Sequence, residues 1–212
     1  MNIYTKLKND FLYCVLLVTI PIISIMYNIL NNKNRGVHSL VTDIDKEIPF
    51  NPVFILPYMS WFVFVVIVFC YICFKDKKIY LKTLAAYDIC LIISFFIYYS
   101  FQTTVPRPIV LDNNIFGSMV KSMYNSDKPF NCFPSIHCIS CYLMIKAVRV
   151  ANIKNKFFQL SVYIMSILIM LSTLFVKQHV ILDVIFGILL GQLVFEVISI
   201  IEKKLFEILN NY

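Results

Sequence analysis

Long runs of apolar residues alternate with short polar stretches along the chain. Several runs approach the roughly 20 residues that a helix needs to cross about 30 Å of hydrocarbon. The pattern predicts six transmembrane helices, at residues 11–30, 53–74, 81–104, 134–150, 157–176 and 179–201. We therefore expect an all-α integral membrane protein, with residues 1–212 forming a single membrane domain built as a six-helix bundle.

The polar stretches between the runs mark where the expected spans end. The first connection, residues 31–52, holds two prolines and an acidic group made of Asp43, Asp45 and Glu47. A KDKK stretch at residues 75–78 separates the second and third spans, and the longest loop covers residues 105–131. A signal peptide would have a shorter apolar core than the first run, so we expect that run to stay as an anchored span.

The composition agrees with a membrane protein and excludes an ordinary soluble domain. The chain is 59% hydrophobic and 15% charged, with a mean hydropathy of +0.77, whereas soluble domains are about half apolar and a quarter charged. The net charge of +7 is spread over short loops, with no basic stripe interleaved with aromatic residues. Contact with lipid headgroups explains this charge better than nucleic acid does, so the expected partner is the lipid bilayer.

The distribution of positive charge between the loops predicts the orientation. Twelve lysines and arginines lie on the side of the two termini and seven on the other side. Cytoplasmic loops carry the excess of such residues, which places both termini in the cytoplasm of a multi-pass cell-membrane protein. Polar residues at the opposite ends of the spans then face the extracytoplasmic side.

The seven cysteines lie mostly within apolar runs. Cys70-x-x-Cys73 and His137-Cys138-x-x-Cys141 superficially resemble the spacings of metal or redox sites. Small apolar residues within lipid-spanning helices are the simpler interpretation. The sequence therefore predicts no disulfide framework, no metal and no cofactor.

The start of the sixth span carries a polar pair that could be structural or catalytic. His179 and Asp183 are four residues apart, so at helical spacing the carboxylate can hold one imidazole nitrogen. A carboxylate within a membrane helix is costly and usually has a partner and a function. The order of the six spans also delivers Arg107, Ser135 and His137 to this outer face.

Three stretches together resemble the three-part motif of the type-2 phosphatidic acid phosphatase superfamily, a family of membrane phosphatases and phosphotransferases. They are VPRP at residues 105–108, FPSIH at residues 133–137, and residues 172–183, which end in HVILD. The PSxH block and the HxxxD end match in full. The segment from Asp45 to Trp61, with its IPF and Tyr-x-x-Trp, is similar to small bacterial members related to inositol phosphorylceramide synthase.

Two positions depart from the phosphatase pattern. Ser100 stands seven residues before Arg107, where the family has a lysine, and Thr173 stands six residues before His179, where it has an arginine. Lys177 lies nearby and can supply one of the missing charges. These departures favour the lipid phosphotransferase branch of the family over a simple phosphatase.

The resemblance, together with the needs of an in-line attack on phosphorus, suggests a role for each residue. His179 is the expected nucleophile, oriented by Asp183, and its product is a phosphohistidine. His137 is the expected general acid and base: it protonates the leaving alcohol and later activates the acceptor. The expected phosphate-binding residues are Arg107, Ser135 at a helix N-terminus, and Lys177.

We therefore expect a metal-independent membrane enzyme that cleaves or transfers the phosphoryl group or headgroup of a lipid phosphate or pyrophosphate at the outer face. Water and an alcohol are both compatible as acceptor, so a hydrolase and a phosphotransferase of the inositol phosphorylceramide synthase type both stay open. A transporter would have its ionisable groups near mid-membrane, whereas these cluster at span ends. A catalytically degenerate membrane subunit is a further alternative, which Ser100 and Thr173 favour.

Overall fold

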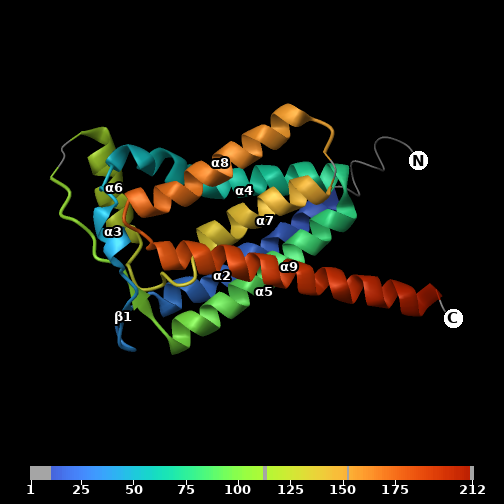
Figure 1. Ribbon diagram of the computed structural model, residues 1–212, viewed down its shortest axis with the longest axis horizontal. Coiled ribbons are helices and arrows are strands. Elements are labelled where there is room, and N and C mark those ends of the chain that lie inside the picture. The colour runs from blue at the N-terminus through green and yellow to red at the C-terminus, as the bar shows by residue number, and fades with distance from the viewer. Residues whose placement is uncertain (1–10, 112–113, 152, 211–212) are drawn as a thin grey trace.

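The computed structural model describes residues 11–111, 114–151 and 153–210, and most of them are helical. The bundle is built from α2 (Thr19–Leu30), preceded by the 3-10 turn η1 (Val15–Val18), and from α4 (Ile55–Lys75), α5 (Lys77–Ser100), α7 (Ile136–Val150), α8 (Lys156–Phe175) and α9 (Ile181–Asn210). Short elements gather at one end of it (Figure 1): β1 (His38–Ser39), α3 (Asp43–Glu47), η2 (Pro52–Phe54), β2 (Thr103–Thr104) and α6 (Ile115–Ser126).

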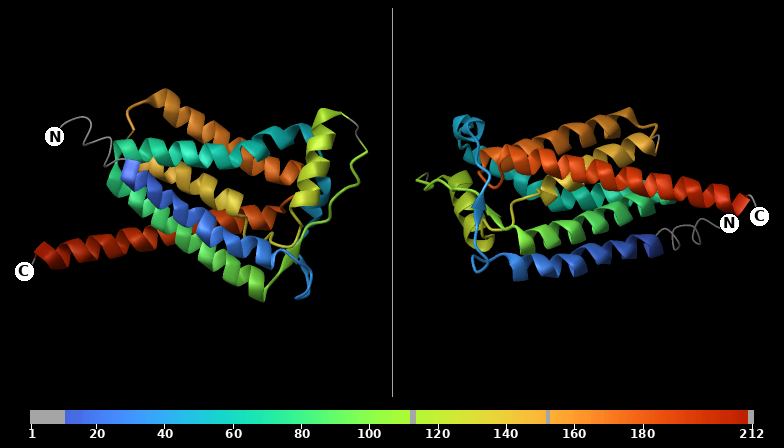
Figure 2. Two further views of the ribbon diagram at one scale, coloured as in Figure 1. Left: turned by 180° about the vertical axis from the view of Figure 1, so that it is seen from behind. Right: turned by 60° about the horizontal axis from the view of Figure 1, so that its bottom comes forward.

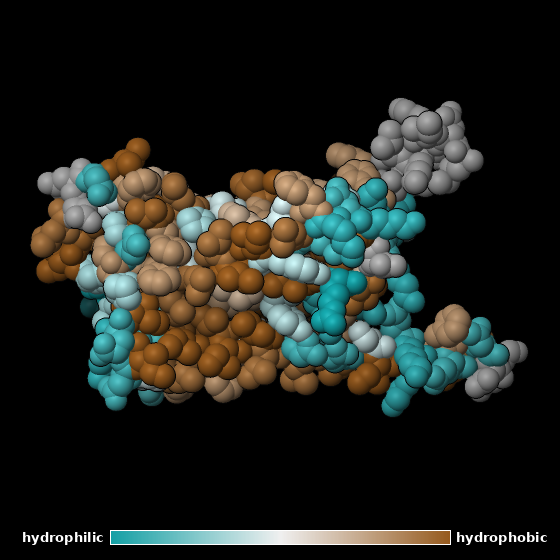
Figure 3. Space-filling model, turned by 45° about the horizontal axis from the view of Figure 1, so that its top comes forward, coloured by the Kyte–Doolittle hydropathy of each residue, from teal (hydrophilic) through white to brown (hydrophobic). Residues whose placement is uncertain are grey.

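Five helical stretches in the described ranges are long and apolar enough to cross a membrane: Phe11–Leu30, Pro52–Lys75, Lys77–Ser100, Lys156–Phe175 and Ile181–Asn210. They correspond to five of the six expected spans. Figure 3 shows the result on one face of the molecule, where hydrophobic residues cover the middle, hydrophilic residues gather at the right-hand end, and both kinds mix at the left-hand end. The chain is therefore a multi-pass membrane protein.

The helix at the fourth expected span, α7, differs from the others in length and burial. It has only 15 residues, about 22 Å at 1.5 Å per residue, which is less than the thickness of the hydrocarbon core. It packs against α4, α5, α8 and α9, and most of its residues are buried. Because other helices surround α7, its first turn lies within the bundle.

The third span lies about one helical turn earlier than expected. We expected residues 81–104, but α5 runs from Lys77 to Ser100. Asp76 starts the helix, because its carboxylate accepts a hydrogen bond of 3.0 Å from the Ile79 N–H. The break between the second and third spans is thus one residue long.

The sixth span begins later and ends later than the expected residues 179–201. The helix α9 starts at Ile181, so His179 precedes it, and its described part ends at Asn210. Figures 1 and 2 show its last turns projecting beyond the other helices. Nearly all residues of these turns are exposed.

A small parallel sheet is the departure from an all-α fold within the described residues. His38 and Ser39 of β1 pair with Thr103 and Thr104 of β2. This pairing places the connection between α2 and α4 beside the chain that leaves α5, and the two together cover one end of the bundle.

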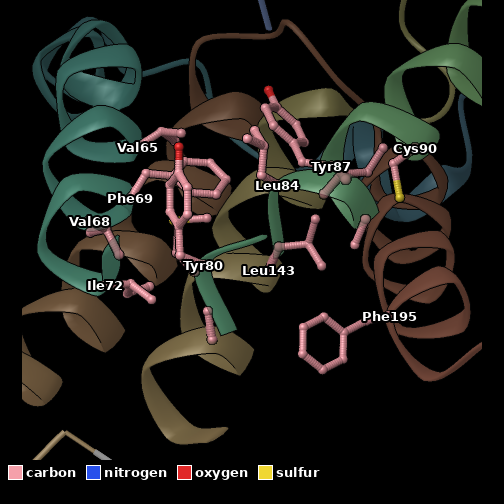
Figure 4. Packing of buried hydrophobic residues seen from close by; sticks show 14 of the residues in the cluster. Val65, Val68, Phe69, Ile72, Tyr80, Leu84, Tyr87, Cys90, Leu143 and Phe195 are labelled. Atoms are coloured by element: carbon pink, nitrogen blue, oxygen red, sulfur yellow. The ribbon is translucent and has the colours of Figure 1, made fainter. Parts of the chain in front are cut away.

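The main core lies among α4, α5, α7 and α9. Figure 4 shows Phe69 of α4, Tyr80 and Leu84 of α5, Leu143 of α7 and Phe195 of α9 converging there. Each of these side chains is at most 5% exposed. Large apolar side chains also remain on the outside of α4, α8 and α9, as expected for helices whose other face contacts lipid.

Two glycines of α9 allow it to cross α7 closely. A Cβ atom at Gly187 would lie 2.8 Å from the carbonyl oxygen of Ser135, and one at Gly191 would lie 3.2 Å from a ring carbon of Tyr142. Gly187 therefore sets how closely the start of α7 approaches α9.

Candidate active site

The polar residues predicted from the sequence gather where α7 and α9 begin, at the end of the bundle that carries the short elements. Asp183 is fully buried in the first turn of α9, and His179 is 7% exposed. The Nδ1 atom of His179 lies 3.2 Å from the Asp183 carboxylate. The structure thus brings the predicted pair together, and it leaves the Nε2 atom of His179 as the nitrogen available for chemistry.

The pair forms in a different way from the expected one-face arrangement on a helix. His179 lies in the turn between α8 and α9, and the N–H groups of Gln178 and His179 both donate to the carbonyl of Thr173, at 2.9 and 3.1 Å. Lys177 has a φ of 51° in the same turn. Asp183 reaches back to accept the Val180 N–H at 3.0 Å, so one carboxylate both caps α9 and holds the imidazole.

A carboxylate from the connection between α2 and α4 braces the same turn. Asp45 accepts a 2.8 Å hydrogen bond from the Ile181 N–H at the start of α9, and it also caps α3 through Thr42. Burial works to raise the pKa of Asp45, but hydrogen bonds from Thr42 and Ile181 and the nearby charge of Lys177 hold it below its usual value. Sequence reasoning noted Asp45 without giving it this role.

The second histidine, His137, lies in the first turn of α7 and is held between aromatic rings. Its ring centroid lies 4.7 Å from that of Tyr58 and 4.2 Å from that of Trp61, both on α4. Trp61 is itself held by a 2.7 Å hydrogen bond to Ser140. The Tyr-x-x-Trp spacing seen in the sequence therefore forms a cradle for this imidazole.

The two imidazoles face one another at the centre of the site. The ring centroids of His137 and His179 are 5.7 Å apart in an edge-to-face arrangement. The Nδ1 atom of His137 is buried and has no hydrogen-bond partner within the described ranges. A phosphoryl group bonded to one ring would therefore lie within reach of the other.

Ser135 caps α7 from a fully buried position. Its hydroxyl oxygen accepts from the Cys138 N–H at 3.3 Å, and its own N–H donates to the carbonyl of Asp183 at 3.1 Å. Pro134 directly precedes this cap, and Ile136 is the first helical residue. Ser135 joins the starts of α7 and α9, and its bond to a phosphate oxygen stays a prediction.

The predicted cation Arg107 is engaged mainly with protein acceptors. One terminal nitrogen donates to the carbonyls of Tyr124 and Asp127, at 3.2 and 2.7 Å, and the other donates to the Gln178 side chain at 2.7 Å. Its guanidinium also lies 4.4 Å from the centre of the Tyr124 ring. Its Nε is buried without a partner in the described part of the chain.

Lys177, the other predicted cation, hydrogen-bonds to the connection between α2 and α4. Its ammonium donates to the carbonyls of Asp45 and Ile48. Burial lowers the pKa of Lys177 and the nearby Asp45 carboxylate opposes this change. The two carbonyls are uncharged, so these hydrogen bonds do not neutralise the positive charge of Lys177.

The two positions that depart from the family pattern do not supply replacement groups. Ser100 donates to the Phe96 carbonyl of its own helix, and Thr173 donates to the Met170 carbonyl. Such bonds back to the preceding turn are common for hydroxyl residues in membrane helices. The backbone of Thr173, through its carbonyl, shapes the turn that carries His179.

Three cavities meet at the two histidines. The cationic pocket, about 300 Å³, is lined by Lys46, Arg107, Lys177 and His179, by the carboxylate residue Asp45, and otherwise mostly by apolar residues. The apolar groove, about 670 Å³, runs along α2 and α4 and ends at His137. Between them lies a central pocket of about 10 Å³, whose lining includes His137, His179 and Gln178.

Gln178 and Asp127 line the central pocket although the sequence did not single them out. Asp127 follows α6 and accepts hydrogen bonds from the side chains of Tyr27 and Asn31, both at 2.8 Å. Neither residue belongs to a motif, so only the fold reveals them. Within the described ranges, no three His, Cys, Asp or Glu side chains form a group that could hold a metal ion.

Taken with the apolar bundle, these features define a multi-pass membrane protein whose polar residues meet at one end of the spans. A family model described as the PAP2 superfamily matches residues 79–207. The chain therefore belongs to the PAP2 superfamily, whose members are phosphatases and phosphotransferases, and the family expected from the motifs is confirmed. No curated protein and no solved structure matches the chain.

Proposed function

We propose that the protein cleaves or transfers the phosphoryl group of a lipid phosphate or pyrophosphate through a phosphohistidine at His179. The observation that carries this proposal is the pair of imidazoles, 5.7 Å apart, standing between a cationic pocket and an apolar groove. An amphiphilic substrate with an anionic head fits such a junction, because each part of it meets a surface of matching character.

In the first step, Nε2 of His179 attacks phosphorus and forms a P–N bond while the P–O bond to the leaving group breaks. Asp183 accepts from Nδ1, which fixes the tautomer and stabilises the positive ring. His137 gives a proton to the leaving oxygen. The products of this step are the free alcohol and phosphohistidine 179.

In the second step, His137 takes a proton from the acceptor, either water or an alcohol, whose oxygen attacks phosphorus. The new P–O bond forms as the P–N bond breaks, and His179 is regenerated. Hydrolysis and transfer thus use the same residues and differ in the acceptor alone.

The apolar groove supports a lipid as the leaving group. It is lined by side chains of α2 and α4, including Leu17, Ile20, Met59 and Phe62, and it reaches His137. In an in-line displacement the leaving group departs on the side opposite the nucleophile. A hydrocarbon chain in the groove would therefore bring its ester oxygen to the acid, His137.

The cationic pocket supports an anionic group on the side of His179. Arg107 and Lys177 both line it, and the hydrogen-bond acceptors of each are uncharged; the Asp45 carboxylate also lines it and lies near Lys177, which leaves Arg107 as the main source of positive charge. Ser135 at the N-terminus of α7 adds the partial positive charge of a helix end. We propose that these three residues bind the phosphate.

The excess of lysine and arginine near the two termini supports placing the site at the extracytoplasmic face of the cell membrane. Labelling of a cysteine introduced at Asn125, close to the site on α6, tests this orientation. An impermeant thiol reagent added to intact cells is expected to label it, and protection would contradict the outer location.

The decisive experiment uses purified protein and a panel of radiolabelled lipid phosphates and pyrophosphates. Wild-type protein is expected to form an acid-labile, base-stable phosphoenzyme and to turn over, whereas His179→Ala forms none and His137→Ala forms it slowly. His38→Ala is the matched control, since His38 is exposed in β1 and stacks on Phe101. Unchanged turnover in His179→Ala would refute the nucleophile assignment.

The same assay separates the two acceptors. Release of inorganic phosphate identifies water, whereas a new phospholipid formed only when a lipid alcohol is added identifies transfer of the inositol phosphorylceramide synthase type. If no substrate in the panel reacts with the wild-type protein, the catalytically degenerate alternative replaces this proposal.

A further inference from the structure

The Gln178 side chain is an unexplained donor within the candidate site. It is 5% exposed, and its Oε1 atom accepts the 2.7 Å hydrogen bond from Arg107. Its Nε2 atom is buried and has no partner among the residues that the structure describes. A buried amide that donates to nothing is costly, so this position calls for an acceptor that arrives with a ligand.

The orientation of this amide follows from chemistry. Arginine has donors and no acceptor, so the oxygen of Gln178 has to face Arg107 and its NH₂ group has to face away. The other terminal nitrogen of Arg107 donates in turn to the carbonyls of Tyr124 and Asp127. Arg107 therefore fixes the orientation of the Gln178 amide and polarises it.

The space that Gln178 lines suits a single oxygen atom. The central pocket has a volume of about 10 Å³, which is roughly the space that one water-sized probe occupies. Gln178 shares this pocket with both His137 and His179. An acceptor bound there would lie between the nucleophile and the general acid, where a phosphoryl oxygen has to lie during transfer.

We propose that Gln178 is a catalytic residue that donates its Nε2–H to a non-bridging oxygen of the transferred phosphoryl group, with Arg107 acting as its positioning residue. The inference rests on the proposed function. It explains how the site can work with Thr173 in place of an arginine. The neutral amide of Gln178, polarised by Arg107, provides a hydrogen-bond donor from the residue next to the nucleophile. A neutral donor also suits a phosphorus that carries one negative charge, as in a diester.

The test compares variants of Gln178 that separate support from catalysis. Gln178→Glu keeps an oxygen for Arg107 and the shape of the side chain, but it replaces the donor with an acceptor that repels a phosphoryl oxygen. Gln178→Met removes the donor without adding charge. Gln102→Met is the matched control, because Gln102 is also buried, at 2% exposed, and donates to the Leu30 carbonyl away from the three cavities.

The readout is the single-turnover rate of phosphoenzyme formation with a labelled lipid phosphate, together with thermal unfolding of each full-length variant. Both Gln178 variants are expected to form phosphoenzyme about 10²–10³ times more slowly than wild type, the usual loss for one oxyanion donor. The Gln102→Met variant is expected to stay within about threefold, the scatter of a substitution that leaves the site intact.

Two results would overturn the inference. A wild-type rate in Gln178→Glu would mean that the residue only supports Arg107, and slower breakdown of the phosphoenzyme with normal formation would mean that Nε2 holds the acceptor. Both outcomes differ from a failure of the proposed function. That failure would be seen as phosphoenzyme that still forms in His179→Ala.

Discussion

The two ends of the helix bundle handle charge in opposite ways. At the end where α5 begins, lysines meet carboxylates of α9. The ammonium of Lys82 lies 2.6 Å from Glu202, and that of Lys146 lies 2.7 Å from Glu196. Charge at this end is paired and serves to hold neighbouring helices together.

At the other end, Lys46 and Asp43 form an exposed ion pair, but the cations and carboxylates nearest the histidines hydrogen-bond to different partners. Arg107 and Lys177 bond to carbonyls and to the Gln178 amide. Asp183 and Asp45 accept from backbone N–H groups, and Asp183 also holds an imidazole. A carbonyl positions a cation without neutralising it, so this end keeps a field that attracts an anion. The difference shows which end is built for support and which for a ligand.

The largest effect is expected from Asp183→Asn, which replaces the carboxylate that holds His179 in the candidate site. One carboxylate oxygen, Oδ2, accepts from both His179 and the Val180 N–H; an amide has no negative charge to stabilise the positive imidazole, and its NH₂ group can favour the wrong tautomer. We expect kcat to fall on the order of 10³–10⁴-fold, as when the carboxylate of a catalytic triad is replaced by an amide. Single-turnover phosphoenzyme formation measures it.

Asp43→Asn is the control for this change. Asp43 lies in α3, its side chain is 96% exposed, and its partner is the nearby Lys46. It is expected to react like the wild type. If Asp183→Asn also retains wild-type kcat, Asp183 is a structural cap alone and the contrast between the two ends loses its main support.

A smaller effect is expected from Gly187→Ala, which moves the two sides of the site apart. The added methyl group would meet the Ser135 carbonyl at 2.8 Å, and this backbone atom can move only with the start of α7. Overpacking of this kind costs about 1–3 kcal/mol of stability, and a misplacement near 1 Å costs on the order of 100-fold in rate.

Gly191→Ala, one turn farther from the site, sharpens this prediction. Its methyl group would meet the Tyr142 ring at 3.2 Å, and that side chain can shift. Thermal unfolding and kcat for the two variants should differ, with Gly191→Ala close to wild type. Equal losses of rate would show that the crossing supports the fold without positioning the histidines.

Asp45→Asn is expected to have a moderate effect that depends on pH. The pKa of Asp45 is lowered in the folded protein, so its stabilising contribution is present above the unfolded pKa and is lost as pH falls through the folded pKa. The thermal stability of the wild type should therefore fall below about pH 4, the usual range of a free aspartate. The variant should lose less stability over the same range. Above that range, loss of one cap costs about 1 kcal/mol.

Other groups also titrate below pH 4, so Asp43→Asn again provides the reference. Its pH dependence should match that of the wild type. A pH dependence in Asp45→Asn identical to that of the wild type would mean that the hydrogen bonds to Thr42 and Ile181 contribute nothing to stability.

The sequence predicted the elements whose signal is local. Hydropathy located five membrane-length helices, and spacing paired His179 with Asp183. It could not give the helix ends, because α5 starts at an Asp76 cap and α9 starts only after His179. Side-chain hydrogen bonds at caps decide these boundaries, and hydropathy does not register them.

The sequence could not predict contacts between distant segments. Trp61 and Ser140 are 79 residues apart, and Arg107 and Gln178 are 71 residues apart. Gln178 follows no motif, and its importance arises because Arg107 occupies its oxygen. Only the folded bundle shows that the Gln178 amide nitrogen is left without a partner among the described residues and that Gln178 lines the pocket between the histidines.

The smallest effect is expected at the paired end of the bundle. Lys146→Met removes the ion pair with Glu196, a residue whose side chain is 45% exposed. Exposed pairs contribute about 0–1 kcal/mol, and the methionine keeps the apolar stem of the lysine in place. We expect a small change in thermal unfolding and unchanged phosphoenzyme formation. A large loss of rate would mean that charge at this end is coupled to the histidines across the bundle, and the separation between a supporting end and a reacting end would be wrong.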